Sequence, residues 1–179
     1  MECAGYNFAL LVGSRQFAVD TSFASSGTYR GSGNCRSYYP RAMKVHNGYL
    51  YVASYYGNRI FRLNLSNGNC DWNTYARYPN TLDIQNNHLY SLNRSTIIVR
   101  NLSTGTDISC SYNATLRSQG RYAYGMAVDH NASNMYLQYY RNLYRFTIGT
   151  NKCPTTSAAF SVSSPAGYYS FGMNHLNSI

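Results

Sequence analysis

Acidic side chains are scarce in this sequence. Only 6 of its 179 residues are Asp or Glu, against 15 Lys or Arg, so the formal net charge is +9. The carboxylates stand far apart along the chain, and no two are spaced as a general acid–base pair. The 4 histidines and 5 cysteines show no metal-site spacing, and no Gly-x-Ser-x-Gly element or phosphate-binding glycine loop occurs. We therefore expect no enzyme activity, no metal and no cofactor.

Long apolar runs are missing as well. No run reaches the roughly 18 residues of a membrane-spanning helix, and the start, Met1-Glu2-Cys3, lacks the basic segment of a secretory signal. The chain nevertheless holds five Asn-x-Ser/Thr sequons, where chance would give about two or three. These sequons favour a secreted, extracellular glycoprotein whose signal was removed or not included. The candidate glycosylation sites are Asn64, Asn93, Asn101, Asn113 and Asn131.

One pattern recurs four times: a tyrosine stands four residues ahead of a Met or Leu. In the best-preserved copy, three short runs (43–45, 49–54 and 60–65) are rich in β-branched or aromatic residues and are separated by Asn-Gly-type turns, which predicts a meander of antiparallel strands. A fourth, outer strand is expected between a cysteine that closes each copy and the next tyrosine. We expect the recurring tyrosines to pack between neighbouring repeats. The four pairs are Tyr39/Met43, Tyr78/Leu82, Tyr122/Met126 and Tyr169/Met173.

The two ends of the chain predict how the repeats are arranged. The N-terminal part begins in the middle of a unit, with runs at 8–12 and 17–19, and the missing first strand occurs at 171–176. We therefore predict an all-β fold, a four-bladed β-propeller of four-stranded antiparallel blades whose first blade is closed by the C-terminal strand. A β-sandwich and a fragment of a larger propeller are the alternatives. The predicted blades are residues 3–39 plus 170–179, 40–78, 79–122 and 123–169.

The segment Asn47–Ser54, followed by Asn58–Leu63, resembles the blade repeat of NHL-type propellers, in which a G-x-LYVA strand precedes an NRI strand. The number of blades is similar to that of hemopexin-like domains. Both resemblances concern strand packing and imply a propeller fold. Neither assigns a function to any residue.

Four of the cysteines, Cys35, Cys70, Cys110 and Cys153, hold matching positions at the ends of polar stretches. Matching positions on different blades should lie farther apart than the roughly 7 Å between Cα atoms that a disulfide tolerates. We therefore expect these four not to pair with one another, and Cys3 to reach Cys35 or Cys153. The remaining cysteines would be half-buried thiols or outward-facing crosslinks between subunits.

The chain is rich in tyrosine, with 20 residues. Aromatic faces stack on sugars, amides pair with hydroxyls, repetition raises avidity and positive charge favours acidic glycans. We expect a non-catalytic, lectin-like module that binds glycans or an extracellular protein, although a solvated hairpin tip would look the same. The alternative is a structural or adhesive matrix protein that self-associates; nucleic acid is an unlikely partner because the arginines are spread along the chain. The candidate contacts lie at one turn in two repeats: Tyr55, Tyr56, Asn58 and Arg59, and Tyr139, Tyr140, Arg141 and Asn142.

A second set of polar residues alternates with apolar ones on the predicted first strands. These side chains are expected to line a central channel, with an ion pair between Lys44 and Asp83 or Asp129 as the structural alternative. The set is Lys44, His46, Asp83, Gln85, Asp129 and Asn174.

Overall fold

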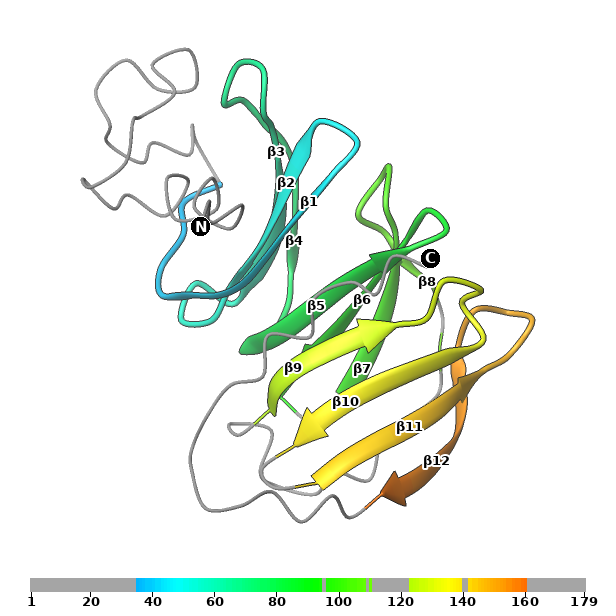
Figure 1. The fold of residues 1–179 in the computed structure, drawn as a ribbon. Helices are drawn as coiled ribbons and strands as arrows, with labels where there is room; N and C mark the ends of the chain where they lie inside the picture. Colours follow the sequence, from blue (N-terminus) through cyan, green and yellow to red (C-terminus); the bar gives the residue numbers. More distant parts are fainter. Residues whose placement is uncertain (1–34, 95, 109, 111–122, 140–141, 161–179) are drawn as a thin grey trace, which may run out of the picture.

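A computed structural model describes residues 35–94, 96–108, 110, 123–139 and 142–160 of the chain (Figure 1). Twelve strands occur in these residues, arranged as three four-stranded antiparallel sheets. Within each sheet the spatial order follows the chain order, so each sheet is a simple meander. The all-β prediction is therefore confirmed for this part of the chain.

The strand bounds show the repeat directly. The first sheet contains β1 (Pro40–His46), β2 (Tyr49–Ser54), β3 (Arg59–Asn64) and β4 (Cys70–Tyr75). The second contains β5 (Pro79–Gln85), β6 (His88–Asn93), β7 (Thr96–Asn101) and β8 (Asp107–Ile108). The third contains β9 (Ala123–Val128), β10 (Asn134–Tyr139), β11 (Asn142–Ile148) and β12 (Pro154–Phe160).

The turns form where the sequence signals placed them. Asn47 and Gly48, between β1 and β2, have φ values of 47° and 76°, and Asn86 and Asn87, between β5 and β6, have values of 46° and 60°. Two successive left-handed residues make the two-residue hairpin turn that Asn-Gly favours. These turns fix the strand register, in which His46 faces Tyr49.

The recurring tyrosine marks a bend at the start of the first strand of a sheet. Tyr39 and Tyr78 both adopt left-handed backbone angles, with φ of 60° and 47°, and each precedes a proline. The pairing register shifts just after each of them, between Pro40 and Ala42 and again at the start of β5. A bulge at this point lets the chain turn into the strand.

The first strands of the three sheets lie side by side, with β5 between β1 and β9 (Figure 1). Apolar side chains fill the space between consecutive sheets. Tyr51, Ile60 and Leu82 belong to the core shared by the first two sheets, and Val99 and Phe146 belong to the core of the second and third. Stacked meanders with apolar layers between them are typical of a propeller-like arrangement.

Part of the predicted architecture lies outside the described residues: 3–34 and 170–179 of the first blade, together with Tyr122 and Tyr169. The described part holds three sheets, so closure into a ring of four remains a prediction. The packing role of the recurring tyrosine is wrong for Tyr39, which is 57 % exposed. Tyr78 does contact the preceding sheet, because its ring centroid lies 5.2 Å from that of Tyr55.

Candidate functional site

Tyrosines gather where β1 begins and β2 ends. The Tyr55 N–H donates to the Tyr39 carbonyl at 3.0 Å, and the Tyr56 N–H donates to the Tyr38 carbonyl at 3.1 Å. The Ser54 hydroxyl accepts from the Tyr38 N–H at 2.7 Å and donates to the Tyr38 carbonyl at 3.1 Å. These bonds extend the pairing of the two strands and hold both tyrosine pairs on a fixed backbone.

The rings form a contiguous cluster. Ring centroids are 5.2 Å apart for Tyr39 and Tyr56, 5.0 Å for Tyr55 and Tyr56, and 6.2 Å for Tyr38 and Tyr56. Aromatic pairs at such distances stabilise one another by roughly 0.5–1.5 kcal/mol beyond their buried area. Tyr38 and Tyr56 are 70 % and 54 % exposed, so the cluster presents aromatic surface to solvent.

A guanidinium group lies within this cluster. The Cζ atom of Arg41 is 4.1 Å from the centroid of the Tyr55 ring and 5.7 Å from that of Tyr39, which are cation–π distances. Its Nη1 donates to Asn80 Oδ1 at 2.9 Å, and Asn80 is buried on β5. The positive charge is therefore held in place. We call Tyr38, Tyr39, Tyr56 and Arg41 the tyrosine–arginine surface.

The predicted contact residues of this turn divide into two groups. Tyr56 is exposed, but Tyr55 is only 6 % exposed, so its prediction as a surface contact is wrong: its ring lies beneath Arg41. Asn58 has a φ of 51° and its Oδ1 accepts from the Tyr78 N–H at 3.0 Å, while Arg59 Nε donates to the Gly57 carbonyl at 3.3 Å. Both of these side chains form hydrogen bonds that hold the turn.

The matching turn of the third sheet is described only in part. Tyr139 ends β10 and Asn142 begins β11, and the pairing of these two residues closes the hairpin. Tyr140 and Arg141 lie outside the described residues. Sequence reasoning missed Tyr38, Tyr39 and Arg41 as surface residues. The sequence signal for these surface residues was the Tyr-Tyr-Pro-Arg run at 38–41. The antiparallel pairing of β1 with β2 places this run beside Tyr55 and Tyr56.

The charge at this end of the sheets is positive. Arg77, which is exposed, lies 6.0 Å from the ring of Tyr78. The four carboxylates of the described part lie elsewhere: Asp71 and Asp107 follow the β3–β4 and β7–β8 turns, Asp129 follows β9, and Asp83 is buried within β5. None of the described carboxylates lies beside the tyrosine–arginine surface. An anion that approaches it is therefore attracted by Arg41 and Arg77 and is not repelled by a nearby described Asp.

The polar residues predicted on the first strands link those strands together. Lys44 Nζ lies 2.7 Å from Asp83 Oδ1, which confirms the predicted ion pair. Asp83 Oδ2 accepts from the Val128 N–H at 2.7 Å, and Asp83 is 2 % exposed. Gln85 Nε2 donates to the His130 carbonyl. A buried charge needs such partners, and Asp83 thereby joins β1, β5 and β9.

The other members of that set lie at the strand ends. His46 is half-buried at the end of β1. Asp129 Oδ1 accepts from the Ser133 N–H at 2.7 Å, and Oδ2 accepts from Asn134 Nδ2 at 2.8 Å. Partial burial alone would raise the pKa of Asp129. The hydrogen bonds outweigh this effect and hold that pKa below its ordinary value. Asn174 lies outside the described residues, and within those that are described no group of three His, Cys, Asp or Glu could hold a metal.

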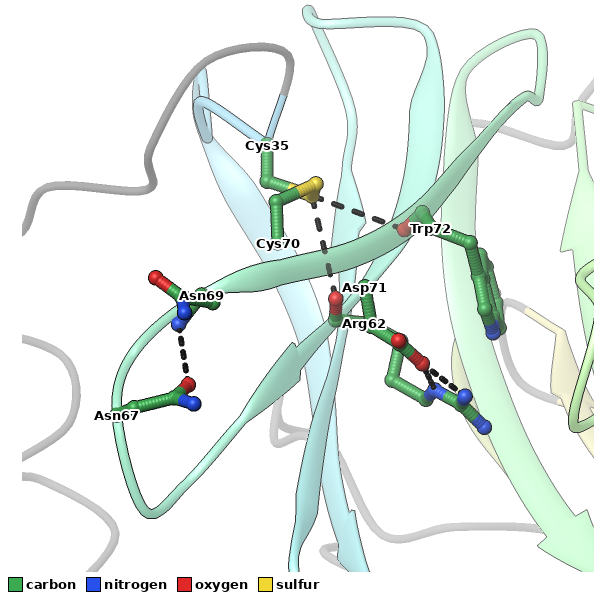
Figure 2. Close-up of a disulfide and its surroundings, with 7 residues drawn as sticks. All are labelled: Cys35, Arg62, Asn67, Asn69, Cys70, Asp71 and Trp72. Atoms are coloured by element: carbon green, nitrogen blue, oxygen red, sulfur yellow. Dashed lines mark hydrogen bonds and ion pairs between the residues drawn. A yellow bond between two sulfur atoms is a disulfide. The ribbon is translucent and has the colours of Figure 1, made fainter.

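The cysteine prediction is wrong. Cys35 is bonded to Cys70, with a Cα separation of 5.6 Å (Figure 2). Cys110 is bonded to Cys153, with a Cα separation of 5.5 Å. Four cysteines are thus paired inside the chain, so they cannot crosslink subunits. Cys3 lies outside the described residues. Two disulfides are compatible with an oxidising, extracellular compartment.

The pairing is possible because the cysteine positions only look equivalent. Cys70 pairs with Leu63 across β3 and β4, and the residue at this place in the second sheet is Asp107, which pairs with Arg100. Cys110 stands three residues farther along. The second bridge therefore joins the chain after β8 to the turn before β12, in the neighbouring sheet.

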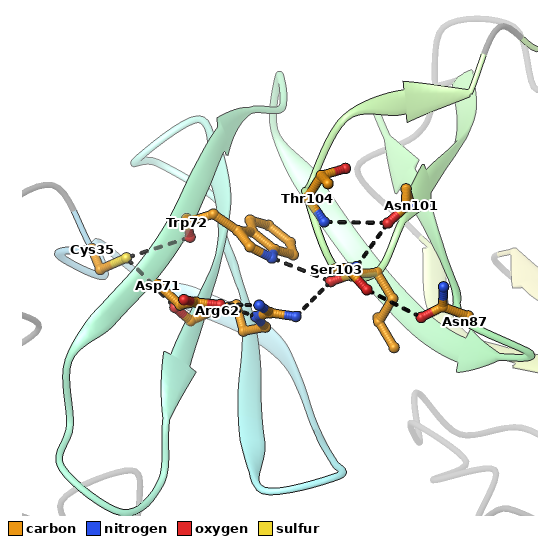
Figure 3. Close-up of polar contacts among 9 residues, drawn as sticks. Cys35, Arg62, Asp71, Trp72, Asn87, Asn101, Ser103 and Thr104 are labelled. Carbon is orange, nitrogen blue, oxygen red and sulfur yellow. Dashed lines mark hydrogen bonds and ion pairs between the residues drawn. The ribbon is translucent and has the colours of Figure 1, made fainter.

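Polar contacts also join the first and second sheets (Figure 3). Arg62 Nη1 and Trp72 Nε1 both donate to the Leu102 carbonyl, at 2.9 Å and 3.2 Å. Arg62 is also ion-paired with Asp71, and its Cζ lies 4.2 Å from the centroid of the Tyr49 ring. The β7–β8 turn of the second sheet is thereby held against β3 and β4.

A buried guanidinium group makes a second link. Arg100 on β7 is fully buried; its Nη2 donates to the Tyr75 carbonyl at 3.1 Å and its Nη1 to Ser91 Oγ at 2.9 Å. Its Nε lies 2.7 Å from Asp107 Oδ1. Burial lowers the pKa of Arg100, and the nearby carboxylate opposes this.

The structure separates the candidate glycosylation sites. Asn93, at the end of β6, is only 4 % exposed, and this burial argues against a glycan on the folded protein at that position. Asn64 and Asn101 end β3 and β7 and are half-buried, and Asn131 is exposed. Asn113 lies outside the described residues.

Together, the stacked meanders define a β-propeller-like fold. No protein-family model and no curated protein sequence matches the chain. Solved structures do match. The computationally designed Ika4 protein is similar with a TM-score of 0.52 and 11 % identity over 66 % of this chain and 71 % of that one.

Structures of other propeller proteins also match. Hydrazine synthase of Kuenenia stuttgartiensis is similar with a TM-score of 0.55 and 11 % identity over 74 % of this chain. KlHsv2 with loop 6CD replaced by a Gly-Ser linker is similar with a TM-score of 0.52 and 12 % identity over 70 %. The matched parts span 38 % and 42 % of those two chains. Identities this low support the fold alone, and neither the NHL nor the hemopexin type is singled out. Among the described residues, no helix is long and apolar enough to cross a membrane.

Proposed function

We propose that this protein is a secreted, non-catalytic β-propeller module that binds acidic glycans through the tyrosine–arginine surface. The observation that carries the proposal is the exposed ring cluster of Tyr38, Tyr39 and Tyr56 around the fixed guanidinium of Arg41. The ring would be completed by the predicted first blade, residues 3–39 plus 170–179.

Each part of the surface suits a part of such a ligand. Tyrosine ring faces stack on the apolar faces of sugar rings, and their hydroxyls remain in reach of sugar hydroxyls. The Arg41 guanidinium can form two parallel hydrogen bonds to a carboxylate or sulfate group. Because Arg41 is already held by Asn80 and Tyr55, little side-chain freedom is lost on binding.

Calorimetric titration with matched polysaccharides tests the proposal. We expect a uronic-acid or sulfated polymer to bind at low salt, a neutral polymer of the same length to bind much more weakly, and affinity to fall as salt is raised. Replacing Tyr56 by Ala removes an aromatic contact of about 1 kcal/mol and should weaken binding about fivefold. Arg41→Gln should weaken binding by a similar factor and reduce the salt dependence.

Two control variants make the result specific. Tyr56→Phe keeps the ring and should bind nearly as well as the wild type. Lys152→Gln removes one cation from the β11–β12 turn, at the opposite end of the sheets, and should leave affinity unchanged. Equal losses for Arg41→Gln and Lys152→Gln would mean that net charge alone drives binding. Absence of binding to any acidic polymer at low salt would refute the proposed function.

A further inference from the structure

Apart from Asn93, the sequon asparagines that the structure describes lie at one end of the sheets: Asn64, Asn101 and Asn131. In an antiparallel meander, the first and third turns lie at one end and the second turn at the other. Asn64 and Asn101 stand at third turns, and Asn131 stands at the first turn of the third sheet. The Leu102 N–H donates to the Asn87 carbonyl at 3.0 Å, which ties the third turn to the first. We call this the sequon end.

The tyrosine–arginine surface lies at the other end, where β1 begins and the β2–β3 turn follows (Figure 1). Asn93, which ends β6, also lies at that end. Among the described residues, Asn64, Asn101 and Asn131 are therefore separated from the exposed Tyr38, Tyr39 and Tyr56 by the length of the strands.

The side-chain oxygens of Asn64 and Asn101 accept matching hydrogen bonds; those of Asn101 are drawn in Figure 3. Asn64 Oδ1 accepts from the Ser66 N–H at 2.8 Å and from Ser66 Oγ at 2.6 Å. Asn101 Oδ1 accepts from the Ser103 N–H at 2.9 Å and from the Thr104 N–H at 3.2 Å. In both residues the oxygen forms the turn, and Nδ2, the atom that carries a glycan, has no hydrogen bond to a described residue.

We infer that Asn64, Asn101 and Asn131 carry N-linked glycans, that Asn93 does not, and that the glycans cover the sequon end while leaving the tyrosine end open. In this reaction Nδ2 attacks the anomeric carbon of a lipid-diphosphate-linked oligosaccharide. The new N–C bond forms as the bond from that carbon to phosphate breaks; the lipid diphosphate leaves and Nδ2 loses one proton. This inference rests on the proposed secretion of the protein and not on the proposed ligand.

Site mapping of the full chain, secreted from a eukaryotic host, tests the inference. Glycopeptides are released with an amidase in heavy-oxygen water, which marks each formerly glycosylated Asn, and are identified by mass spectrometry. We expect marks at positions 64, 101 and 131 and an unmarked Asn93. Marked Asn93 in folded, monodisperse protein, or unmarked Asn64 and Asn101, would overturn the inference.

Matched variants separate the sequon from the fold. Ser66→Ala should abolish the glycan at Asn64 and shift the gel mobility by one glycan, whereas Ser66→Thr keeps the sequon and should not. A tyrosine-selective reagent then tests the open end: labelling rates of Tyr38 and Tyr56 should agree within twofold between glycosylated and enzymatically deglycosylated protein. Much slower labelling of the glycosylated form would show that glycans cover the tyrosine end.

Discussion

A close backbone approach joins the first two sheets, and replacing Gly105 by Ala tests it. Gly105, in the β7–β8 turn, has a φ of 71°, and a Cβ atom there would lie 2.7 Å from Trp72 Cε3 and 2.8 Å from Trp72 Cδ2. Gly48, in the β1–β2 turn, has a similar φ of 76° but no atom within 4 Å of its would-be Cβ. Gly48→Ala is therefore a matched control for the backbone strain alone.

The two substitutions share one cost and differ in another. Placing alanine in the left-handed region costs roughly 1–2 kcal/mol in both variants. Only Gly105→Ala also forces the Trp72 ring to move, which adds roughly 1–3 kcal/mol of overpacking and weakens the hydrogen bond from Trp72 Nε1 to the Leu102 carbonyl. We expect Gly105→Ala to lower the free energy of unfolding by about 2 kcal/mol more than Gly48→Ala, or about 4–8 °C in melting temperature.

Tryptophan fluorescence detects this change directly, because Trp72 is the only tryptophan in the sequence. Urea unfolding followed by tryptophan fluorescence and by far-ultraviolet circular dichroism gives the free energies. The emission maximum of folded Gly105→Ala should also move relative to the wild type, while that of Gly48→Ala should not. Equal destabilisation of the two variants with unchanged emission would refute the packing of the β7–β8 turn on β4.

Three further outcomes are expected. Asp107→Ala leaves the buried Arg100 charge without its carboxylate and should lower the free energy of unfolding by about 3 kcal/mol. Arg100→Met leaves an exposed carboxylate that water can solvate and should lower it by about 1 kcal/mol. Thermal melts that give the reverse order would contradict this. Cys153→Ser opens the Cys110–Cys153 loop, a separation of 43 residues, and should cost about 4 kcal/mol; unchanged stability in non-reducing urea titrations would argue against this bridge. Because the pKa of Asp129 is lowered in the folded state, its contribution is present above the unfolded pKa of about 3.9 and is lost as the pH falls through the folded pKa. Asp129→Asn should therefore flatten the acid limb of the stability–pH curve, and an unchanged limb would contradict the hydrogen-bond assignment.

The strands could be predicted from the sequence because each has its own local signal. Short runs of apolar and aromatic residues mark β2 and β6, and Asn47-Gly48 and Asn86-Asn87 mark the turns, which do adopt left-handed angles. The Lys44–Asp83 pair could also be predicted. The two residues occupy the same position in successive repeats, and the strands that carry them lie side by side.

The other contacts between sheets, such as the Cys110–Cys153 disulfide, could not be predicted in the same way, because they depend on offsets of a few residues. β8 has only two residues, Asp107–Ile108, and lies before Cys110, where the sequence pattern placed the outer strand after it. A shift of three residues along a strand moves a side chain to the opposite face. The apparent equivalence of the cysteines therefore hid the Cys110–Cys153 pairing.

The same offsets bear on how many ligands the chain binds. A repeat that presented its tyrosines in every copy would bind a polymer at several sites and gain avidity. In the second sheet, however, the positions of Tyr38 and Tyr55 are occupied by Arg77 and Arg94, as the shared register of β1–β2 and β5–β6 shows. The tyrosine–arginine surface is thus absent from the second sheet, while the matching residues of the third sheet lie outside the described part of the chain. Titration with an acidic oligosaccharide too short to bridge two sites should therefore give fewer sites than there are repeats, and Tyr56→Ala should weaken one of these sites.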